Sequence, residues 1–198
     1  MKLAEILAML KAVTPELAPP VVTMVSYAIV YRHGLERYID DAIAAGVAGA
    51  IVPDLLVEEA APLAAVCRSR DFSLVQLVTP TTPRDRAMRI AETSSGFLYY
   101  VSVTGITGER AEIPPDLIEN VGWLRSRTKL PICIGFGISR PEHVRSLAPA
   151  ADGLIVGSAL VRRIAAAEKS PRDEVLADVG RYIDELRAAL EPAQGTSR

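Results

Sequence analysis

Two short glycine-containing segments in the last third of the chain carry the residues best suited to chemistry. They are Ile134-Gly135-Phe136-Gly137-Ile138-Ser139 and Asp152-Gly153-Leu154-Ile155-Val156-Gly157-Ser158-Ala159. Each contains the end of an apolar run typical of a buried strand, and each leads into a segment with helical spacing. Because glycine has no Cβ, its backbone can approach an anion closely, and the amides of a following helix N-terminus can donate to that anion. The pattern predicts a phosphate-binding site, although two turns with incidental glycines would share this spacing.

The segments that must position these glycines alternate between strand and helix along the whole chain. Apolar runs predict strands at 21–26, 48–52, 73–78, 97–103, 130–134 and 154–156. Helical spacing predicts helices at 3–13, 35–45, 57–69, 83–93, 115–127, 141–147, from 158, and at 171–190. Such alternation predicts a parallel sheet covered by helices, an α/β fold. In (β/α)8 barrels the phosphate site typically lies after strands seven and eight.

The number of strands sets the expected architecture. A closed (β/α)8 barrel has eight strands, whereas six are predicted here and the first element is a helix. We therefore expect an incomplete TIM barrel that lacks the first two strands and the first helix. It would form a single domain over 1–190, followed by a polar tail at 191–198. A doubly wound open sheet is the alternative, but the glycine fingerprint that such a sheet carries after its first strand is not found here.

Composition excludes several classes of function. The 198 residues are 49% hydrophobic and 23% charged, enough for a substantial core, and the net charge of -2 without a long basic run argues against nucleic-acid binding. Cys67 and Cys133 lie in apolar contexts and are expected to be core thiols of a reducing compartment. No apolar stretch is long enough for a membrane span, and the first residues do not read as a secretory signal. We expect a cytoplasmic protein that binds no membrane.

Several consecutive motifs together resemble one enzyme family. They are Ala45-Gly46-Val47 with Val52-Pro53-Asp54-Leu55, then Glu58-Glu59, the run from Ser95 to Gly108, and the two glycine segments above. From Val22 to about Ile164 the chain resembles the α subunit of tryptophan synthase, a lyase that splits indole-3-glycerol phosphate into indole and glyceraldehyde 3-phosphate. The resemblance implies a TIM barrel active in tryptophan biosynthesis, with no cofactor or metal and with a β subunit as partner in an α2β2 complex.

The resemblance also assigns residues to the substrate. It places the phosphate at Gly108, Gly135, Gly137, Gly157 and Ser158. It places the indole pocket at Tyr99 and Phe136, with Tyr27 and Ile51 facing it from the ends of their strands, and Thr107 in a loop that closes over substrate. For Tyr99 and its neighbour Tyr100, simple alternation along a strand would also turn one ring inward and one toward the outer helices.

No residue of the chain inherits the two proton-transfer carboxylates of the family. The resemblance locates that glutamate and aspartate in the N-terminal part that we expect to be absent, so it gives no catalytic residue here, and we expect binding with little turnover. A non-catalytic phosphate-binding or β-subunit-binding module is the alternative. Asp54 is expected to order its loop and Glu109 to face solvent, while His33 and His143 have no partner pattern and are expected at the surface. Other phosphate-binding barrels, including isomerases and synthases of tryptophan and histidine biosynthesis, fit less well because no strand end here offers a lysine.

Overall fold

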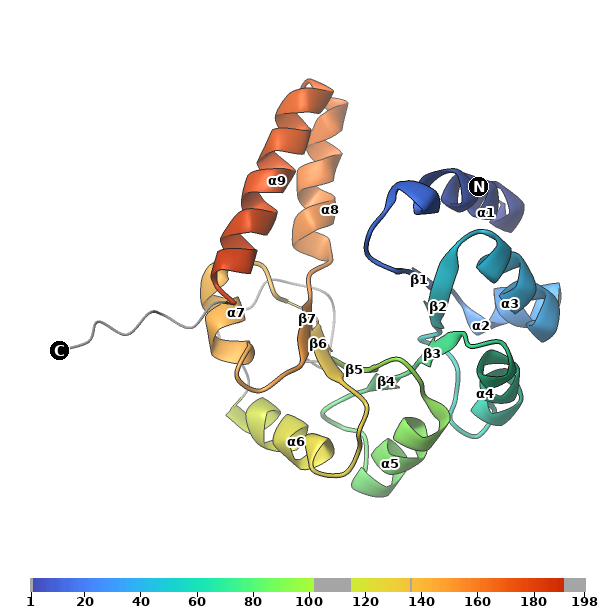
Figure 1. The fold of residues 1–198 in the computed structure, drawn as a ribbon. Coiled ribbons are helices and arrows are strands. Elements are labelled where there is room, and N and C mark those ends of the chain that lie inside the picture. The colour runs from blue at the N-terminus through green and yellow to red at the C-terminus, as the bar shows by residue number, and fades with distance from the viewer. Residues whose placement is uncertain (1, 102–114, 136, 191–198) are drawn as a thin grey trace. The chain divides into compact units, whose positions relative to one another are not determined.

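The computed structural model of the chain describes residues 2–101, 115–135 and 137–190. The chain divides into two compact units, one of Met1–Val78 with Thr82–Leu98 and the other of Thr79–Thr81 with Tyr99–Arg198. Figure 1 shows the elements of both units, in which strands alternate with helices. Within the described residues no helix is both long enough and apolar enough to cross a bilayer.

The first unit is a three-stranded parallel sheet with helices packed against it. Its elements are α1 (Leu3–Val13), η1 (Thr14–Glu16), β1 (Val21–Met24), α2 (Tyr27–His33), α3 (Leu35–Ala44), β2 (Val47–Ile51), α4 (Ala60–Ser69), β3 (Ser73–Val75), β4 (Leu77–Val78) and α5 (Arg84–Thr93). The sheet order is β1-β2-β3, and Met24, Ile51 and Val75 are paired across it. Because each of these residues is the last of its strand, the loops that follow β1 and β2 leave from the same edge.

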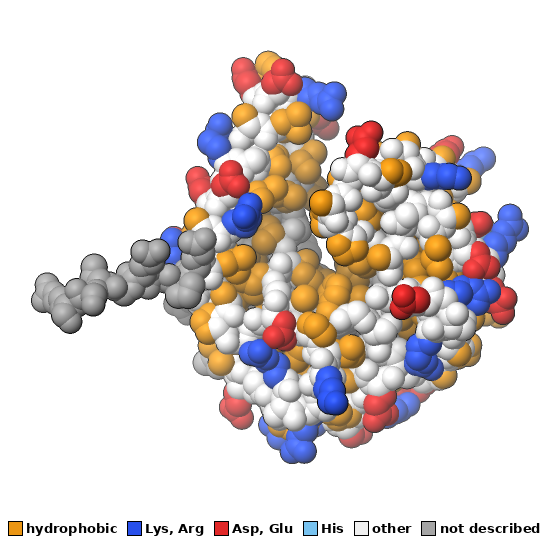
Figure 2. All heavy atoms as spheres, viewed as in Figure 1, with side chains coloured by type: hydrophobic (Ala, Val, Ile, Leu, Met, Phe, Trp, Pro, Cys, Tyr) orange, Lys and Arg blue, Asp and Glu red, His pale blue; other side chains and the backbone are white. Residues whose placement is uncertain are grey.

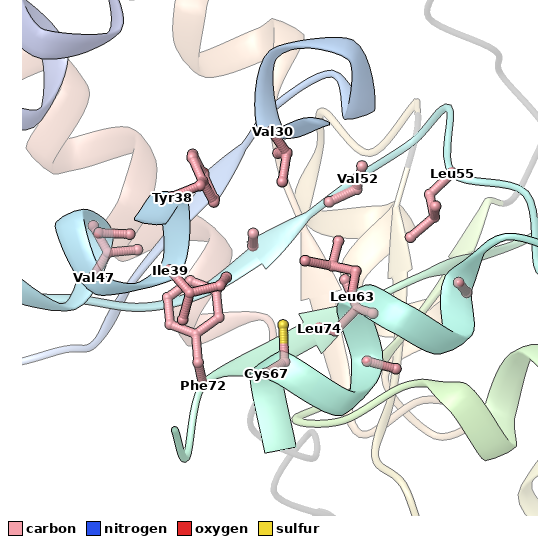
Figure 3. Packing of buried hydrophobic residues seen from close by; sticks show 14 of the residues in the cluster. Val30, Tyr38, Ile39, Val47, Val52, Leu55, Leu63, Cys67, Phe72 and Leu74 are labelled. Carbon is pink, nitrogen blue, oxygen red and sulfur yellow. The ribbon is translucent and has the colours of Figure 1, made fainter. Parts of the chain in front are cut away.

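Helical spacing of apolar residues builds the core of this unit. Helix α3 buries Tyr38, Ile39 and Ala42, and helix α4 buries Leu63 and Cys67 one turn apart. Figure 3 shows Tyr38 and Ile39 of α3 in one cluster with Leu63 and Cys67 of α4. Burial raises the pKa of the Cys67 thiol to about 11, so Cys67 is an inert core residue, as predicted.

The second unit repeats the pattern with strands that lie side by side in the order β5-β6-β7. Its elements are β5 (Leu98–Val101), α6 (Pro115–Arg125), β6 (Ile132–Gly135), α7 (Pro141–Leu147), β7 (Gly153–Ile155), α8 (Ser158–Ala165), η2 (Ala166–Glu168) and α9 (Arg172–Ala188). Helix α9 packs against α8 and α7, and Figure 1 shows α8 and α9 running side by side. Figure 2 shows apolar side chains over this pair. The large exposed ones are Val161, Ile164, Leu176 and Ile183.

Most predicted elements are confirmed, with two corrections. The strand predicted at 73–78 is interrupted at Gln76, so the described residues form seven strands instead of six. The Gln76 side chain is buried, and its Nε2 donates to Thr93 Oγ1 at 2.7 Å. This hydrogen bond directs the side chain toward the end of α5. The segment Tyr27–His33 is a helix, so Tyr27 begins α2 and does not end a strand. The absence of the first two strands and of a helix, and the single domain over 1–190, stay predictions.

Candidate phosphate-binding site and substrate pocket

Two glycine loops leave the second unit's sheet at matching positions. Strands β6 and β7 pair in parallel, with Gly135 opposite Ile155, the last residue of each strand. Gly137 and Gly157 each lie two residues beyond these paired ends. Since carboxyl ends of adjacent parallel strands lie at one edge of the sheet, the register brings the two predicted phosphate loops together.

Gly157 offers open space beside a helix N-terminus. It is the N-cap of α8, which begins at Ser158. A Cβ built on Gly157 would meet no atom within 4 Å in the described part of the chain. The first amides of an α-helix have no acceptor within the helix and carry the positive end of its dipole. This position therefore combines room for an anion with donors to bind it.

Gly135, at the end of β6, and Gly137, in the loop that follows, have different roles. Gly137 has φ 78°, a left-handed conformation that side chains with a Cβ rarely adopt. A Cβ on Gly135 would lie 2.5 Å from the ring and hydroxyl of Tyr99, so its lack of a side chain makes room for that ring. The structure thus gives Gly135 a packing role, and its part in phosphate binding stays a prediction.

Tyr99 and Tyr100 point to opposite sides of β5. The Tyr99 ring lies against Gly135 and is 5% exposed, and burial raises the pKa of its hydroxyl. Burial also raises the pKa of Tyr100, and the negative charge of Asp116 in α6 raises it further. Alternation along the strand therefore separates the two rings, with Tyr99 on the side of the paired glycine loops.

His143 is buried behind the β6 loop, and the prediction of a surface role was wrong. It lies in α7 with 7% exposure. The Ser139 amide donates to its Nδ1 at 3.4 Å, and a guanidinium nitrogen of Arg140 lies 3.2 Å from its Nε2. Proline at the start of α7 fixes where this helix begins, and the ring of His143 then packs under the preceding turn.

In the first unit, the carboxylate of Asp54 joins the loop after β2 to the loop after β1. Asp54, in the loop after β2, accepts hydrogen bonds from the Ser26 hydroxyl at 2.6 Å and from the Tyr27 amide at 2.7 Å. The slight desolvation of this exposed carboxylate would by itself raise the pKa of Asp54, but the hydrogen bonds from Ser26, from Tyr27 and from its own backbone outweigh it and lower the pKa. The prediction that Asp54 orders its loop is confirmed, and the residue that it orders is Tyr27.

Tyr27 lies in an open hollow whose lining includes both aromatic and acidic side chains. Tyr31, Asp54, Glu58 and Glu59 line the hollow with it, and the ring centroids of Tyr27 and Tyr31 are 6.0 Å apart. Arg86 of α5 binds both oxygens of Glu58, at 2.8 and 2.9 Å. Ile51, the other residue predicted at a strand end, is the half-buried last residue of β2.

Four of the predicted residues lie outside the part of the chain that the structure describes, namely Thr107, Gly108, Glu109 and Phe136. His33, expected at the surface, is half-buried at the end of α2, where its Nε2 lies 2.7 Å from Asp41 Oδ2. Among the described residues no cluster of three His, Cys, Asp or Glu side chains is arranged to hold a metal ion.

Alternating parallel strands and helices, with glycine loops at the ends of the last two strands, are typical of phosphate-binding barrel proteins of the (β/α) class. The chain belongs to the tryptophan synthase alpha chain family, whose model matches residues 1–190. The tryptophan synthase alpha chain of Rhodopirellula baltica is 60% identical over 183 residues, which cover 89% of this chain and 66% of that protein. That of Geotalea daltonii is 38% identical, over 95% of this chain and 70% of that protein.

Solved structures agree with the sequence relatives. The tryptophan synthase alpha chain of Legionella pneumophila superposes with a TM-score of 0.85 and 29% identity, over 99% of this chain and 72% of that one. A chain from the tryptophan synthase a2b2 complex of Pyrococcus furiosus gives a TM-score of 0.84 and 33% identity, over 95% and 75%. The 198 residues therefore span about two thirds to three quarters of the length of these relatives.

Proposed function

We propose that this chain carries the phosphate-binding part, and much of the indole pocket, of a lyase that cleaves indole-3-glycerol phosphate in tryptophan biosynthesis. The observation that carries the proposal is the pairing of the two glycine loops after β6 and β7, with open space at Gly157 beside the N-terminus of α8. Membership of the tryptophan synthase alpha chain family supports the choice of substrate.

In this proposal backbone groups hold the phosphate. The amides that follow Gly137 and Gly157 donate to its oxygens, and the Ser158 hydroxyl adds a further donor at the first residue of α8. Gly108 and Gly135 belong to the same proposed set. A dianionic phosphate suits this arrangement because the helix dipole and the amide donors favour negative charge without a buried cation.

Aromatic and apolar side chains hold the indole. Tyr99 and Phe136 supply flat apolar surface. The resemblance alone assigns Tyr27 and Ile51 to the same pocket and Thr107 to the closing loop. Tyr99 is suited to this task because its packing against Gly135 fixes the ring next to the phosphate loops. The ring would therefore set the distance between phosphate and indole.

Cleavage of the carbon–carbon bond needs groups that move protons. The indole ring carbon must gain a proton, and the indole nitrogen and a glycerol hydroxyl must lose theirs, with each positioned group contributing roughly 10²- to 10⁴-fold. Asp54 is a poor candidate because both its oxygens accept hydrogen bonds from Ser26 and Tyr27. We propose that residues 1–198 alone bind the phosphate but turn the substrate over very slowly.

The proposed partner is a tryptophan synthase β subunit. A structural relative of this chain comes from the tryptophan synthase a2b2 complex of Pyrococcus furiosus, and that relative covers 95% of this chain. Co-purification of this chain with the β subunit tests the proposal, and two proteins that elute separately at micromolar concentration would contradict it.

Calorimetric titration with glycerol 3-phosphate tests the phosphate site. Gly157→Val places a side chain in the open space and should weaken binding by about tenfold or more, since the anion must approach the backbone there. Gly122→Val is the matched control, because a Cβ on Gly122 of α6 also meets nothing within 4 Å among the described residues. If both variants bind as tightly as the parent chain, the proposed site is wrong.

A further inference from the structure

We propose that Tyr182 is a positioning residue of the phosphate site, which it holds in shape from α9. This role rests on the proposed function, because it concerns the same two loops. Tyr182 is 3% exposed, and its hydroxyl donates to the Ser139 carbonyl at 3.0 Å across 43 residues of sequence. Ser139 lies two residues after Gly137, so the hydrogen bond acts directly on the loop that would bind the anion.

The loop after β6 needs such a restraint. Gly137 adopts a left-handed conformation, and glycine gives a loop more conformational freedom than any other residue. Within the described part of the chain, the Ser139 amide makes a long contact, 3.4 Å, to His143 Nδ1. The shorter hydrogen bond from the Tyr182 hydroxyl holds the Ser139 carbonyl, and so fixes the Ser139–Arg140 peptide at the end of the loop that contains Gly137.

Tyr182 also contacts α8, through a residue in the last turn of the helix whose N-cap is Gly157. The Arg163 guanidinium carbon lies 4.1 Å from the centroid of the Tyr182 ring, and Arg163 Nη1 donates to Asp178 Oδ2 at 2.7 Å. Arg163 belongs to α8, the helix that begins at Ser158 beside Gly157. One side chain on α9 is therefore in contact with both the β6 loop and the helix whose N-terminus faces the anion.

The substitution Tyr182→Phe isolates this role, because it removes the hydroxyl and keeps the buried ring. Tyr38→Phe is a matched control: Tyr38 is 2% exposed in α3 of the first unit, and its hydroxyl lies 3.1 Å from Thr23 Oγ1. Each variant loses one hydrogen bond from a buried phenol, so we expect similar losses of thermal stability. Binding of glycerol 3-phosphate should weaken about three- to tenfold in Tyr182→Phe only.

Two measurements on the whole chain decide the question. Calorimetry with glycerol 3-phosphate compares affinities, and hydrogen exchange of the peptide that contains 137–143 compares loop protection. Faster exchange there in Tyr182→Phe, with Tyr38→Phe like the parent, supports the positioning role. If the parent chain binds and Tyr182→Phe binds equally well, the role of Tyr182 is wrong while the proposed function stands. If the parent chain binds no glycerol 3-phosphate, the proposed function itself is wrong.

Discussion

The two sheets of this chain end in loops that are held by different chemistry. At the edge of the first unit, a charged side chain joins the loops, since Asp54 accepts hydrogen bonds from Ser26 and Tyr27. At the edge of the second unit, the loops after β6 and β7 depend on glycines and on the hydrogen bond from the Tyr182 hydroxyl. The stability of the first edge should depend on pH. The stability and phosphate binding of the second edge should depend on added side-chain volume. Each edge can therefore be perturbed by a change that leaves the other intact.

The largest expected effect concerns turnover, and it tests whether Asp54 is structural. Residues 1–198 should release indole from saturating indole-3-glycerol phosphate at no more than about a thousandth of the rate of the Rhodopirellula baltica relative, because the resemblance assigns the two proton-transfer carboxylates to none of these residues and both Asp54 oxygens already accept hydrogen bonds. An indole assay provides the measurement. Robust turnover that is lost in Asp54→Asn but kept in Glu58→Gln would make Asp54 the acid–base group and would remove the contrast between the two edges.

Added volume at the second edge should have two separable consequences. Gly135→Ala puts a methyl group 2.5 Å from the Tyr99 ring, and such overpacking should destabilise the fold by about 1 to 3 kcal/mol. Gly157→Ala enters open space and should change stability by less than about 0.5 kcal/mol while it weakens phosphate binding. Urea denaturation with calorimetry separates the two. Equal stability of both variants would show that the Tyr99 ring moves aside.

Acid should act on the first edge. The pKa of Asp54 is lowered in the folded chain, so its contribution to stability is present above the unfolded value near 3.8 and is lost as pH falls through the folded value. Solvent weakens the hydrogen bonds of this exposed carboxylate, so Asp54→Asn should reduce the free energy of unfolding at pH 7 by only about 1 kcal/mol.

The pH dependence of the free energy of unfolding tests whether the charge of Asp54 causes this effect. The difference in free energy of unfolding between the parent chain and Asp54→Asn should shrink as the pH is lowered from 7 to about 3, as measured by urea denaturation at each pH. Gly157→Ala should show a difference from the parent that does not vary with pH. A constant difference for Asp54→Asn would mean that the carboxylate charge does not stabilise the Tyr27 turn.

The sequence predicted the local features and missed the contacts between distant segments. Helix α1 and helix α7 have the predicted bounds, because apolar spacing and a proline at the start of α7 are local signals. Helix α2 was missed because Val30 is its single buried residue, and seven residues carry too little periodicity to be distinguished from a strand.

Contacts across the sequence account for the rest. The packing of Tyr99 on Gly135 joins β5 to β6, and the hydrogen bond from Tyr182 to Ser139 joins α9 to a loop 43 residues earlier. Neither contact leaves a pattern in its own segment. A glycine at a strand end predicts that something approaches closely, but it does not say whether that neighbour is an anion or a ring. The burial of His143 was missed for the same reason, since a single histidine in a helix has no local sign of its neighbours.

The smallest effect tests whether the second edge depends on its backbone. Ser158→Ala removes a hydroxyl at the first residue of α8 and leaves the amide, so it should weaken glycerol 3-phosphate binding by about fivefold, which is about 1 kcal/mol. Gly157→Val, which blocks approach to the amides, should weaken it more. Calorimetry on both variants under one buffer condition gives the ratio. If Ser158→Ala loses as much affinity as Gly157→Val, a side chain holds the anion, and the second edge resembles the first more closely than its glycines indicate.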